Sequence, residues 1–164
     1  MKMLNLTTKR LVLSPLCEAD FEQLIPLYTN ADARRYLGGA LSYKNALVAL
    51  DILLKDIASH SFVVRTHDEI VGMTIVAPHH NQVDTEISFL FLPTHWGNGY
   101  AQESIKCILA FCETKLKLKR VVSETQVANI CSVKLLETLG YKLECTLERF
   151  GEMQGVYVYD FECE

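Results

Sequence analysis

The sequence predicts an α/β (α+β) fold, in which about seven strands form a mixed, mostly antiparallel sheet flanked by about four helices. The chain has 164 residues, of which 49% are hydrophobic and 22% charged, and these values are typical of one folded domain. Alternating apolar and polar residues indicate strands, whereas apolar residues three and four positions apart indicate helices. The resulting order is strand, two helices, three strands, helix, strand, helix and two strands. The strand–helix–strand step in this order predicts one parallel pair.

The first third of the chain contains one expected strand and two expected helices. Apolar and polar residues alternate over 5–14, which predicts a strand. A helix is expected over 18–29, with one apolar face made of Phe21, Leu24, Ile25 and Tyr28. A second helix is expected over 42–59, because Ser42 can cap it and an apolar stripe follows.

The middle of the chain predicts three consecutive strands, over 61–66, 70–77 and 82–92. The polar turn at 67–69 separates the first two strands and indicates a hairpin. The second half of 82–92 is apolar on both faces, so we expect this strand to lie centrally in the sheet. Pro93 ends it.

The last third predicts the helix and strand that complete the parallel step, followed by a closing pair of strands. The expected elements are a helix over 99–116, a strand over 120–125, a helix over 129–139 and strands over 141–150 and 156–162. Gly140 stands where a left-handed helix cap is common. The two final strands are expected to pair antiparallel around a loop at 151–155.

Charge and cysteine content exclude several classes of protein. Sixteen Lys and Arg against 20 Asp and Glu give a net charge of −4 and a pI near 5.7, so nucleic acid is not an expected partner. No apolar run approaches the roughly 18 residues that span a membrane. The six cysteines are scattered without a C-x-x-C pair, and the N-terminus does not resemble a signal peptide. We therefore expect a cytoplasmic protein with free, mostly buried thiols and no metal site.

The segment 89–103, FLFLPTHWGNGYAQE, contains the clearest chemical signal. An apolar strand runs into Pro93, a short loop with Gly97 and Gly99, and then a helix. Glycines at such a turn let backbone N–H groups approach a ligand, and the start of the helix adds unpaired N–H groups and the positive end of the helix dipole. These features favour a phosphate-binding loop that uses backbone donors, because the segment has no Lys or Arg. The alternative is a plain glycine turn before a core helix.

Two common nucleotide-binding motifs are absent from this loop. No Lys follows the glycines as it does in a P-loop, and Gln102 stands where the dinucleotide fingerprint needs a third glycine. A nucleotide-binding domain for NAD or ATP is therefore a remote alternative.

The sequence WGNGYA, entered from a strand and Pro93, resembles the acetyl-CoA signature Q/R-x-x-G-x-G/A of the GNAT N-acetyltransferases. Gly99 and Ala101 match the signature, and Trp96 stands where Gln or Arg is usual. TKRLVLSPL near the N-terminus and ANICSVKLLETLGYK near the C-terminus are similar to the branch of ribosomal-protein N-terminal (alanine/serine) acetyltransferases. The resemblance covers nearly the whole chain and is weakest over 29–59, which shapes the acceptor site in this family.

The resemblance implies a single GNAT domain over 1–164, whose sheet splays at the central parallel pair. It also implies acetyl-CoA as cosubstrate, an amine acceptor, no metal, and either a monomer or a homodimer. Strand backbone groups would bind the pantetheine arm and the thioester oxygen, and the signature loop would hold the pyrophosphate. The implied cofactor-binding residues are Phe89, Leu90, Phe91, Trp96, Gly97, Asn98, Gly99, Tyr100, Ala101, Gln102, Asn129 and Ser132.

Three residues are candidates for catalysis, namely Glu86, Glu124 and Ser132. Transfer to an amine needs a group that takes a proton from the ammonium, and either glutamate can do so if burial raises its pKa. Both can instead be solvated or salt-bridged strand residues. Leu136 stands where many relatives have a Tyr general acid. Ser132, on the same helical face as Asn129, is the expected substitute, although its hydroxyl can instead bond to its own helix backbone.

We therefore expect an N-acetyltransferase that moves an acetyl group from acetyl-CoA to a primary amine by direct attack on the thioester. A protein or peptide N-terminus is the favoured acceptor, and a small amine such as a polyamine, amino acid or antibiotic is the next. A CoA-binding regulatory module without turnover is the alternative from another class, because the usual Tyr is absent. Arg34 and Arg35 are expected at the surface, and His79 and His80 in a solvated turn.

Overall fold

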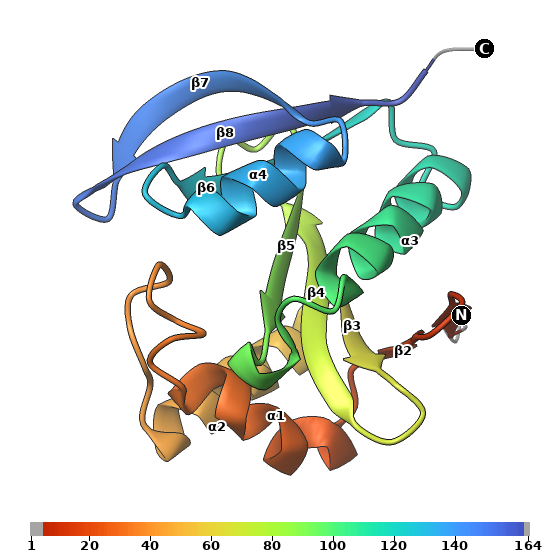
Figure 1. Cartoon of the computed structure of the whole chain (residues 1–164), viewed down its shortest axis with the longest axis vertical. Coiled ribbons are helices and arrows are strands. Elements are labelled where there is room, and N and C mark those ends of the chain that lie inside the picture. The colour runs from red at the N-terminus through yellow and green to blue at the C-terminus, as the bar shows by residue number, and fades with distance from the viewer. Residues whose placement is uncertain (1–4, 163–164) are drawn as a thin grey trace.

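The computed structural model describes residues 5–162, which form one mixed sheet with helices packed against it (Figure 1). The strand order is β1-β2-β3-β4-β5-β6-β8-β7, and all neighbouring pairs are antiparallel except β5 and β6. The strands are β1 (Leu6–Thr7), β2 (Val12–Pro15), β3 (His60–Arg65), β4 (Ile70–Pro78), β5 (Thr85–Phe91), β6 (Arg120–Gln126), β7 (Lys142–Arg149) and β8 (Glu152–Asp160). The helices are α1 (Phe21–Thr29), α2 (Tyr43–Lys55), α3 (Tyr100–Thr114) and α4 (Ile130–Thr138), with short 3₁₀ turns at Glu18–Asp20 and Pro93–His95. The predicted mixed sheet with one parallel pair is confirmed.

None of the helices within residues 5–162 is both long and apolar enough to cross a membrane.

The first expected strand is in fact a hairpin of β1 and β2, which brings the sheet in the described chain to eight strands. The N–H of Thr8 donates to the carbonyl oxygen of Leu11 at 2.9 Å, and the N–H of Leu11 donates to the Thr8 hydroxyl at 3.0 Å. Thr8 and Arg10 also bind Glu103 on α3 through their side chains. Alternation over 5–14 did not reveal the turn, because part of what holds it is Glu103, which lies on a helix far along the chain.

Helix α2 ends at Lys55, four residues before the expected end. The carboxylate of Asp56 accepts a hydrogen bond from the N–H of Ala58 at 2.9 Å, and such a local bond competes with helical pairing. Ile57, which follows, is fully exposed. Ile57 is the last apolar residue of the stripe that predicted a helix over 42–59, and it lies outside the helix.

The closing hairpin is tighter than the sequence indicated. Phe150 and Gly151 both have positive φ and form the turn, so β8 begins at Glu152 and the expected loop at 151–155 is wrong. Gly155 lies inside β8, where an added Cβ would stand 2.8 Å from the ring of Tyr157. This glycine is required by close packing on the sheet and not by a turn.

Two hydrophobic clusters lie on opposite faces of the sheet. Phe62 and Val64 of β3 point into the cluster beneath α3 and α4, whereas Val63 points into the cluster beneath α1 and α2. All three side chains are completely buried, and burial of each contributes about 1.5–3 kcal/mol. Packing on both faces therefore fixes the central strands, on which the site described below is built.

The sheet opens between its two parallel strands. Within the described chain, β5 and β6 pair at only one position, where Glu86 lies opposite Val122. In contrast, β6 pairs with β8 along its whole length. The Ser123 hydroxyl donates to the carbonyl oxygen of Ile87 at 2.7 Å and closes the start of the opening. The paired position lies near the beginning of both strands, so they separate toward their carboxyl ends (Figure 1).

The five cysteines in the described residues are all free, as expected. Cys112 is buried beneath α3, where burial raises the pKa of its thiol to about 12. The expectation that most thiols are buried is wrong, because Cys17, Cys131 and Cys145 are exposed. Cys163 lies outside the described residues.

Candidate active site

The loop between β5 and α3 holds the glycines in a defined conformation. Gly97 and Gly99 both have a φ of +78°, a left-handed conformation that glycine adopts readily, and Gly99 is the N-cap of α3. The indole N–H of Trp96 donates to the carbonyl oxygen of Phe91 at 3.0 Å, and the amide of Asn98 donates to a carbonyl oxygen of the same loop at 3.0 Å. These bonds tie the loop to the end of β5, and the first N–H groups of α3 have no partner within the helix.

A basic side chain reaches this loop from the N-terminal hairpin. The guanidinium of Arg10 lies 4.8 Å from the centroid of the Tyr100 ring and pairs with Glu103 at 2.7 Å. A pocket at the start of α3 is lined by Arg10, Gly99, Gln102, Glu103 and Lys106. No sequence pattern places this positive charge at the loop, because Arg10 precedes Glu103 by 93 positions.

The expected pantetheine-binding residues lie in the second half of β5. Phe89 and Phe91 pack in the cluster beneath α3, and Leu90 packs in the cluster beneath α1 and α2. Their side chains are therefore part of the core, as the sequence analysis allowed. On the edge toward β6, strand pairing stops at Glu86 and the Ser123 hydroxyl occupies the carbonyl oxygen of Ile87, so the backbone groups after Ile87 on that edge are open to a ligand.

Asn129 and Ser132 lie together at the start of α4. The side-chain oxygen of Asn129 caps the helix by accepting the N–H of Ser132 at 3.3 Å, which leaves the Asn129 amide N–H₂ group as a donor. Within residues 5–162, the Ser132 hydroxyl has no hydrogen-bond partner and is partly exposed. It therefore does not make the helix-backbone bond that was the alternative to a catalytic role.

Glu86 and Glu124 are brought together at the opening between β5 and β6. A carboxylate oxygen of Glu86 accepts the backbone N–H of Glu124 at 3.4 Å. Burial, reinforced by the charge of Glu124, raises the pKa of Glu86 above its ordinary value, although His79 and Arg149 oppose the rise. Burial alone would also raise the pKa of Glu124, but the hydrogen bonds from His79, His80 and Arg149 outweigh it and the net shift lowers that pKa.

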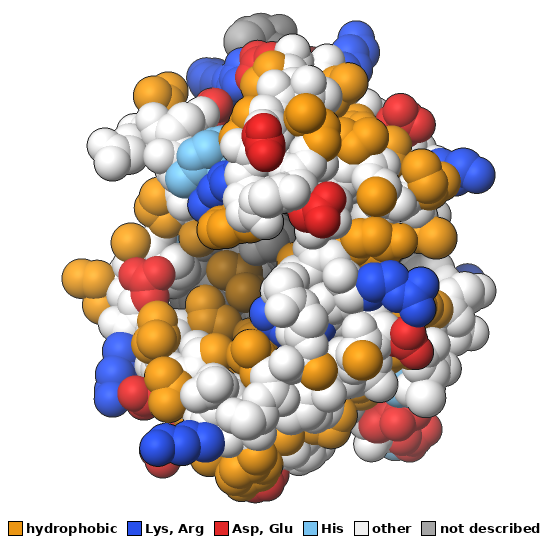
Figure 2. Space-filling model, turned by 90° about the vertical axis from the view of Figure 1, so that its left-hand side faces the viewer, with side chains coloured by type: hydrophobic (Ala, Val, Ile, Leu, Met, Phe, Trp, Pro, Cys, Tyr) orange, Lys and Arg blue, Asp and Glu red, His pale blue; other side chains and the backbone are white. Residues whose placement is uncertain are grey.

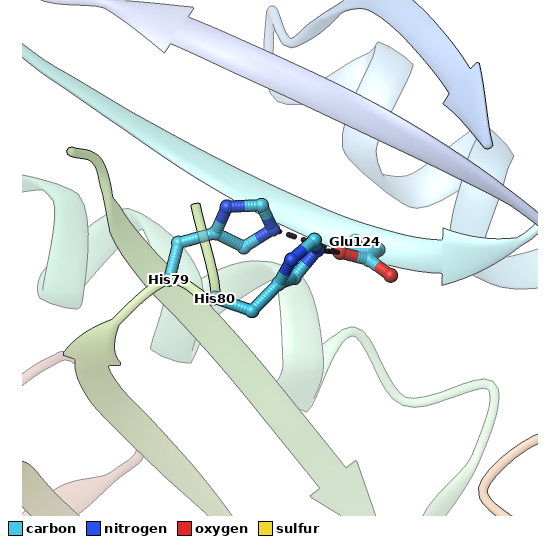
Figure 3. A group of neighbouring side chains, drawn as sticks. All are labelled: His79, His80 and Glu124. Carbon is cyan, nitrogen blue, oxygen red and sulfur yellow. Dashed lines mark hydrogen bonds and ion pairs between the residues drawn. The ribbon is translucent and has the colours of Figure 1, made fainter. Parts of the chain in front are cut away.

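His79, in the turn that follows β4, is buried, contrary to expectation, whereas His80 is exposed. His79 and His80 both point at the same carboxylate oxygen of Glu124, at 2.8 Å and 2.7 Å (Figure 3). The side chain of His79 is 2% exposed, that of Glu124 5% and that of His80 34%. Arg149 donates to the other oxygen of Glu124 at 3.2 Å. No local pattern indicates this cluster, because the turn is polar and Glu124 lies on a strand 44 residues after His80.

The same three side chains have the composition of a metal site, since their ligand atoms lie within 4.8 Å of one another. Two contacts favour a hydrogen-bonded network instead. The N–H of Asn81 faces Nδ1 of His79 at 3.5 Å, whereas a histidine that binds a metal through Nε2 usually donates from its other nitrogen. Arg149 also places a positive charge on Glu124, which disfavours a cation beside it.

The sequence matches a known protein family over most of its length. Residues 10–142 match the model of the acetyltransferase (GNAT) domain. The chain belongs to the GNAT acetyltransferase family. It is thus an acetyl-CoA-dependent acetyltransferase, and the predicted family and enzyme class are confirmed.

Individual relatives of this GNAT chain support the same fold. The uncharacterized N-acetyltransferase p20 of Bacillus licheniformis is 25% identical over 173 residues, which cover 97% of this chain and 95% of p20. RimL, described as a ribosomal L7/L12 alpha-N-protein acetyltransferase, superposes with a TM-score of 0.82 at 15% identity, covering 96% of this chain and 94% of RimL. The spermidine N-acetyltransferase of Vibrio cholerae, solved in complex with CoA and spermine, gives 0.80 at 21% identity, covering 93% and 96%. The two structures show the fold alone at these identities.

Leu136, which stands in place of the Tyr found in many GNAT members, is completely buried beneath α3 and α4. Its position on α4 is therefore a core position in this chain. Leu136 offers no proton donor, and Ser132 is the hydroxyl at the partly exposed start of the same helix.

The loop between α1 and α2 borders the opening on the side expected for the acceptor. The amide of Gln126, the last residue of β6, donates to the carbonyl oxygen of Tyr36 in this loop at 3.2 Å. Arg34 donates to the carbonyl oxygen of Gly39 at 2.7 Å and lies over the Tyr28 ring at 5.7 Å. Arg34 thus braces the loop, whereas Arg35 is an exposed surface residue as expected.

Figure 2 shows the face that carries this loop, with a hollow at its centre and hydrophobic side chains on the walls of the hollow. An acceptor that entered this hollow would contact these hydrophobic side chains. Apolar walls exclude water, and exclusion of water strengthens electrostatic interactions inside a site.

Proposed function

We propose that this GNAT chain, as a single domain over 1–164, transfers the acetyl group of acetyl-CoA to a primary amine by direct attack on the thioester. Acetyl-CoA would enter the opening between β5 and β6. Residues 96–102 would hold the pyrophosphate through backbone N–H groups, and the backbone of 89–91 with Asn129 would hold the pantetheine arm. The free edge of β5 supports this assignment, because its N–H groups can also stabilise the oxyanion of the tetrahedral intermediate.

Glu86 is the general base in this proposal, and the contrast between the two glutamates is the observation that carries it. A base must be ionised yet able to accept a proton near the working pH. Glu86 has a raised pKa, whereas Glu124 has a lowered pKa and already accepts three side-chain hydrogen bonds. Environments that shift two carboxyl groups in opposite directions often separate an acid–base residue from a structural anion.

Ser132 would position the CoA thiolate by a hydrogen bond or return a proton to it. The hydroxyl is unpaired in the described chain and stands one helical turn from the cap residue Asn129. This role requires no metal and no cysteine nucleophile.

The acceptor is proposed to be a protein or peptide N-terminus, with a small amine as the second candidate. The sequence resemblance to ribosomal-protein acetyltransferases and the fold of RimL support the first. The fold of the spermidine acetyltransferase supports the second. A monomer or homodimer and a cytoplasmic location are part of the proposal, and the free thiols of the described cysteines fit a reducing compartment.

Release of free CoA tests the proposal. Acetyl-CoA is incubated with peptides that begin with Ala or Ser, with spermidine, with amino acids and with an aminoglycoside, and the thiol produced is titrated. We expect release that depends on one of these amines. Tight acetyl-CoA binding without amine-dependent release would instead favour a CoA-binding regulatory module.

A further inference from the structure

Acetyl transfer to an amine releases a proton that must leave the site. The amine enters as an ammonium ion, its nitrogen forms a bond to the acetyl carbon, and the bond from that carbon to sulfur breaks. The nitrogen loses two protons, of which one goes to the CoA thiolate and one to solvent. Glu86 can take the second proton but must return to its ionised form before the next turnover. A partly buried carboxylate regenerates faster if another group carries the proton to water.

We propose that His80 is this proton-exit group, held in place by Glu124. This inference rests on the proposed function. The proton passes from Glu86 through water to Nδ1 of His80, whose Nε2–H stays hydrogen-bonded to the Glu124 carboxylate, and then leaves from Nδ1 to solvent. The 3.4 Å contact between a carboxylate oxygen of Glu86 and the backbone N–H of Glu124 places Glu86 beside the residue that binds His80, so water can connect Glu86 with His80.

Burial distinguishes His80 from its neighbour. The His80 side chain is 34% exposed and Nε2 lies 2.7 Å from Glu124, so the ring connects a buried carboxylate with solvent. Within residues 5–162, Glu124 is its only hydrogen-bond partner, so Nδ1 is open to water.

His79 is unsuited to the same task. Its side chain is 2% exposed, and Nδ1 accepts the N–H of Asn81 at 3.5 Å, which leaves the hydrogen on Nε2 toward Glu124. His79 and Arg149 therefore act as fixed donors that orient the carboxylate. The charged and titratable groups around His80 are then Glu124 on β6, Arg149 on β7, Glu86 on β5 and His79 beside it.

Chemical rescue tests the assignment. His80→Ala is assayed for thiol release with acetyl-CoA and the fastest peptide or amine of the panel above, in a dilute buffer and with rising imidazole. We expect turnover to fall about tenfold to a hundredfold, affinity for acetyl-CoA to stay unchanged, and imidazole to restore the rate. The matched control is His67→Ala, which removes a fully exposed turn histidine paired with Asp68 and should keep wild-type turnover.

Three results would overturn the proposal. These are full activity of His80→Ala, a loss that imidazole does not restore, and loss of wild-type activity on chelation with recovery on adding Zn²⁺, which would make the cluster a metal centre. A wild-type chain without amine-dependent release would overturn the proposed function itself. If Glu86→Gln were inactive and His80→Ala fully active, the role of His80 in proton exit would be refuted, and the role of Glu86 as general base would stand.

Discussion

A carboxylate oxygen of Glu86 accepts the backbone N–H of Glu124 at 3.4 Å, across the parallel strands at the point where they separate. This contact places two carboxyl groups with oppositely shifted pKa values at the mouth of one opening. Glu124 is saturated by donors from β7 and from the turn after β4, whereas Glu86 keeps lone pairs for a substrate. The arrangement separates a proton acceptor from a fixed anion.

Replacing Gly99 by Val should weaken acetyl-CoA binding at least about tenfold. The residue has a φ of +78°, which costs an L-residue roughly 1–2 kcal/mol, and an added Cβ would stand 3.4 Å from Arg10. The loop would relax and lose the alignment of its N–H groups. Isothermal titration calorimetry with acetyl-CoA measures the effect.

Gly38→Val is the matched control for that experiment. Gly38 has a φ of +87° and lies in open space on the loop between α1 and α2. A valine there is therefore under similar backbone strain but is distant from the proposed pyrophosphate-binding loop at 96–102. If folded Gly99→Val bound acetyl-CoA with the affinity of the wild type, the assignment of residues 96–102 to pyrophosphate binding would be contradicted.

Ser132→Ala should lower turnover about tenfold or more while leaving acetyl-CoA affinity nearly unchanged, because its hydroxyl is expected to meet charge that develops on sulfur. Steady-state kinetics beside calorimetry separates the two quantities. Cys131→Ala, at the exposed neighbouring position, is the control and should behave as wild type. Unaltered turnover of Ser132→Ala would return the serine to a structural role.

Asn129→Ala should destabilise the protein by about 1 kcal/mol through loss of the helix cap. Its side-chain oxygen accepts the N–H of Ser132 at 3.3 Å, so the first turn of α4 depends on it. We expect a lower midpoint in urea and weaker acetyl-CoA binding together. A stability equal to wild type would mean that solvent caps the helix equally well.

Glu124→Gln should reduce stability near neutral pH by about 1–3 kcal/mol, because it weakens charge-assisted bonds to Arg149 and two histidines. The folded-state pKa of Glu124 lies below its ordinary value of 4.5. Ionised Glu124 therefore contributes its full stabilisation above the ordinary pKa of 4.5. This stabilisation is lost as the pH falls through the lowered pKa of the folded state. Urea unfolding between pH 7 and acid should show the difference between wild type and variant shrinking on acidification. A constant difference would contradict the sign of the shift.

Local patterns predicted most of the fold, and long-range contacts explain what they missed. Pro93 and Gly99 indicated the loop before α3, because the residues of a turn are neighbours in the sequence and determine its conformation locally. The predicted parallel step accounts for the proximity of Glu86 and Glu124, because it places their strands side by side. The burial of His79 was not predicted, because it depends on how the turn after β4 lies against β6. The position of Arg10 beside the loop before α3 was also not predicted, because it depends on a long-range contact between the N-terminal hairpin and α3.

The pH dependence of kcat/KM for wild type, Glu86→Gln and Glu124→Gln tests the central claim most directly. The rate of the wild type should rise with pH through the raised pKa of Glu86, because the base acts only when ionised. Glu86→Gln should lose about 10²–10⁴-fold in rate and the acidic limb with it, whereas Glu124→Gln should keep that limb. Persistence of the limb in Glu86→Gln and its disappearance in Glu124→Gln would contradict the account and make Glu124 the base.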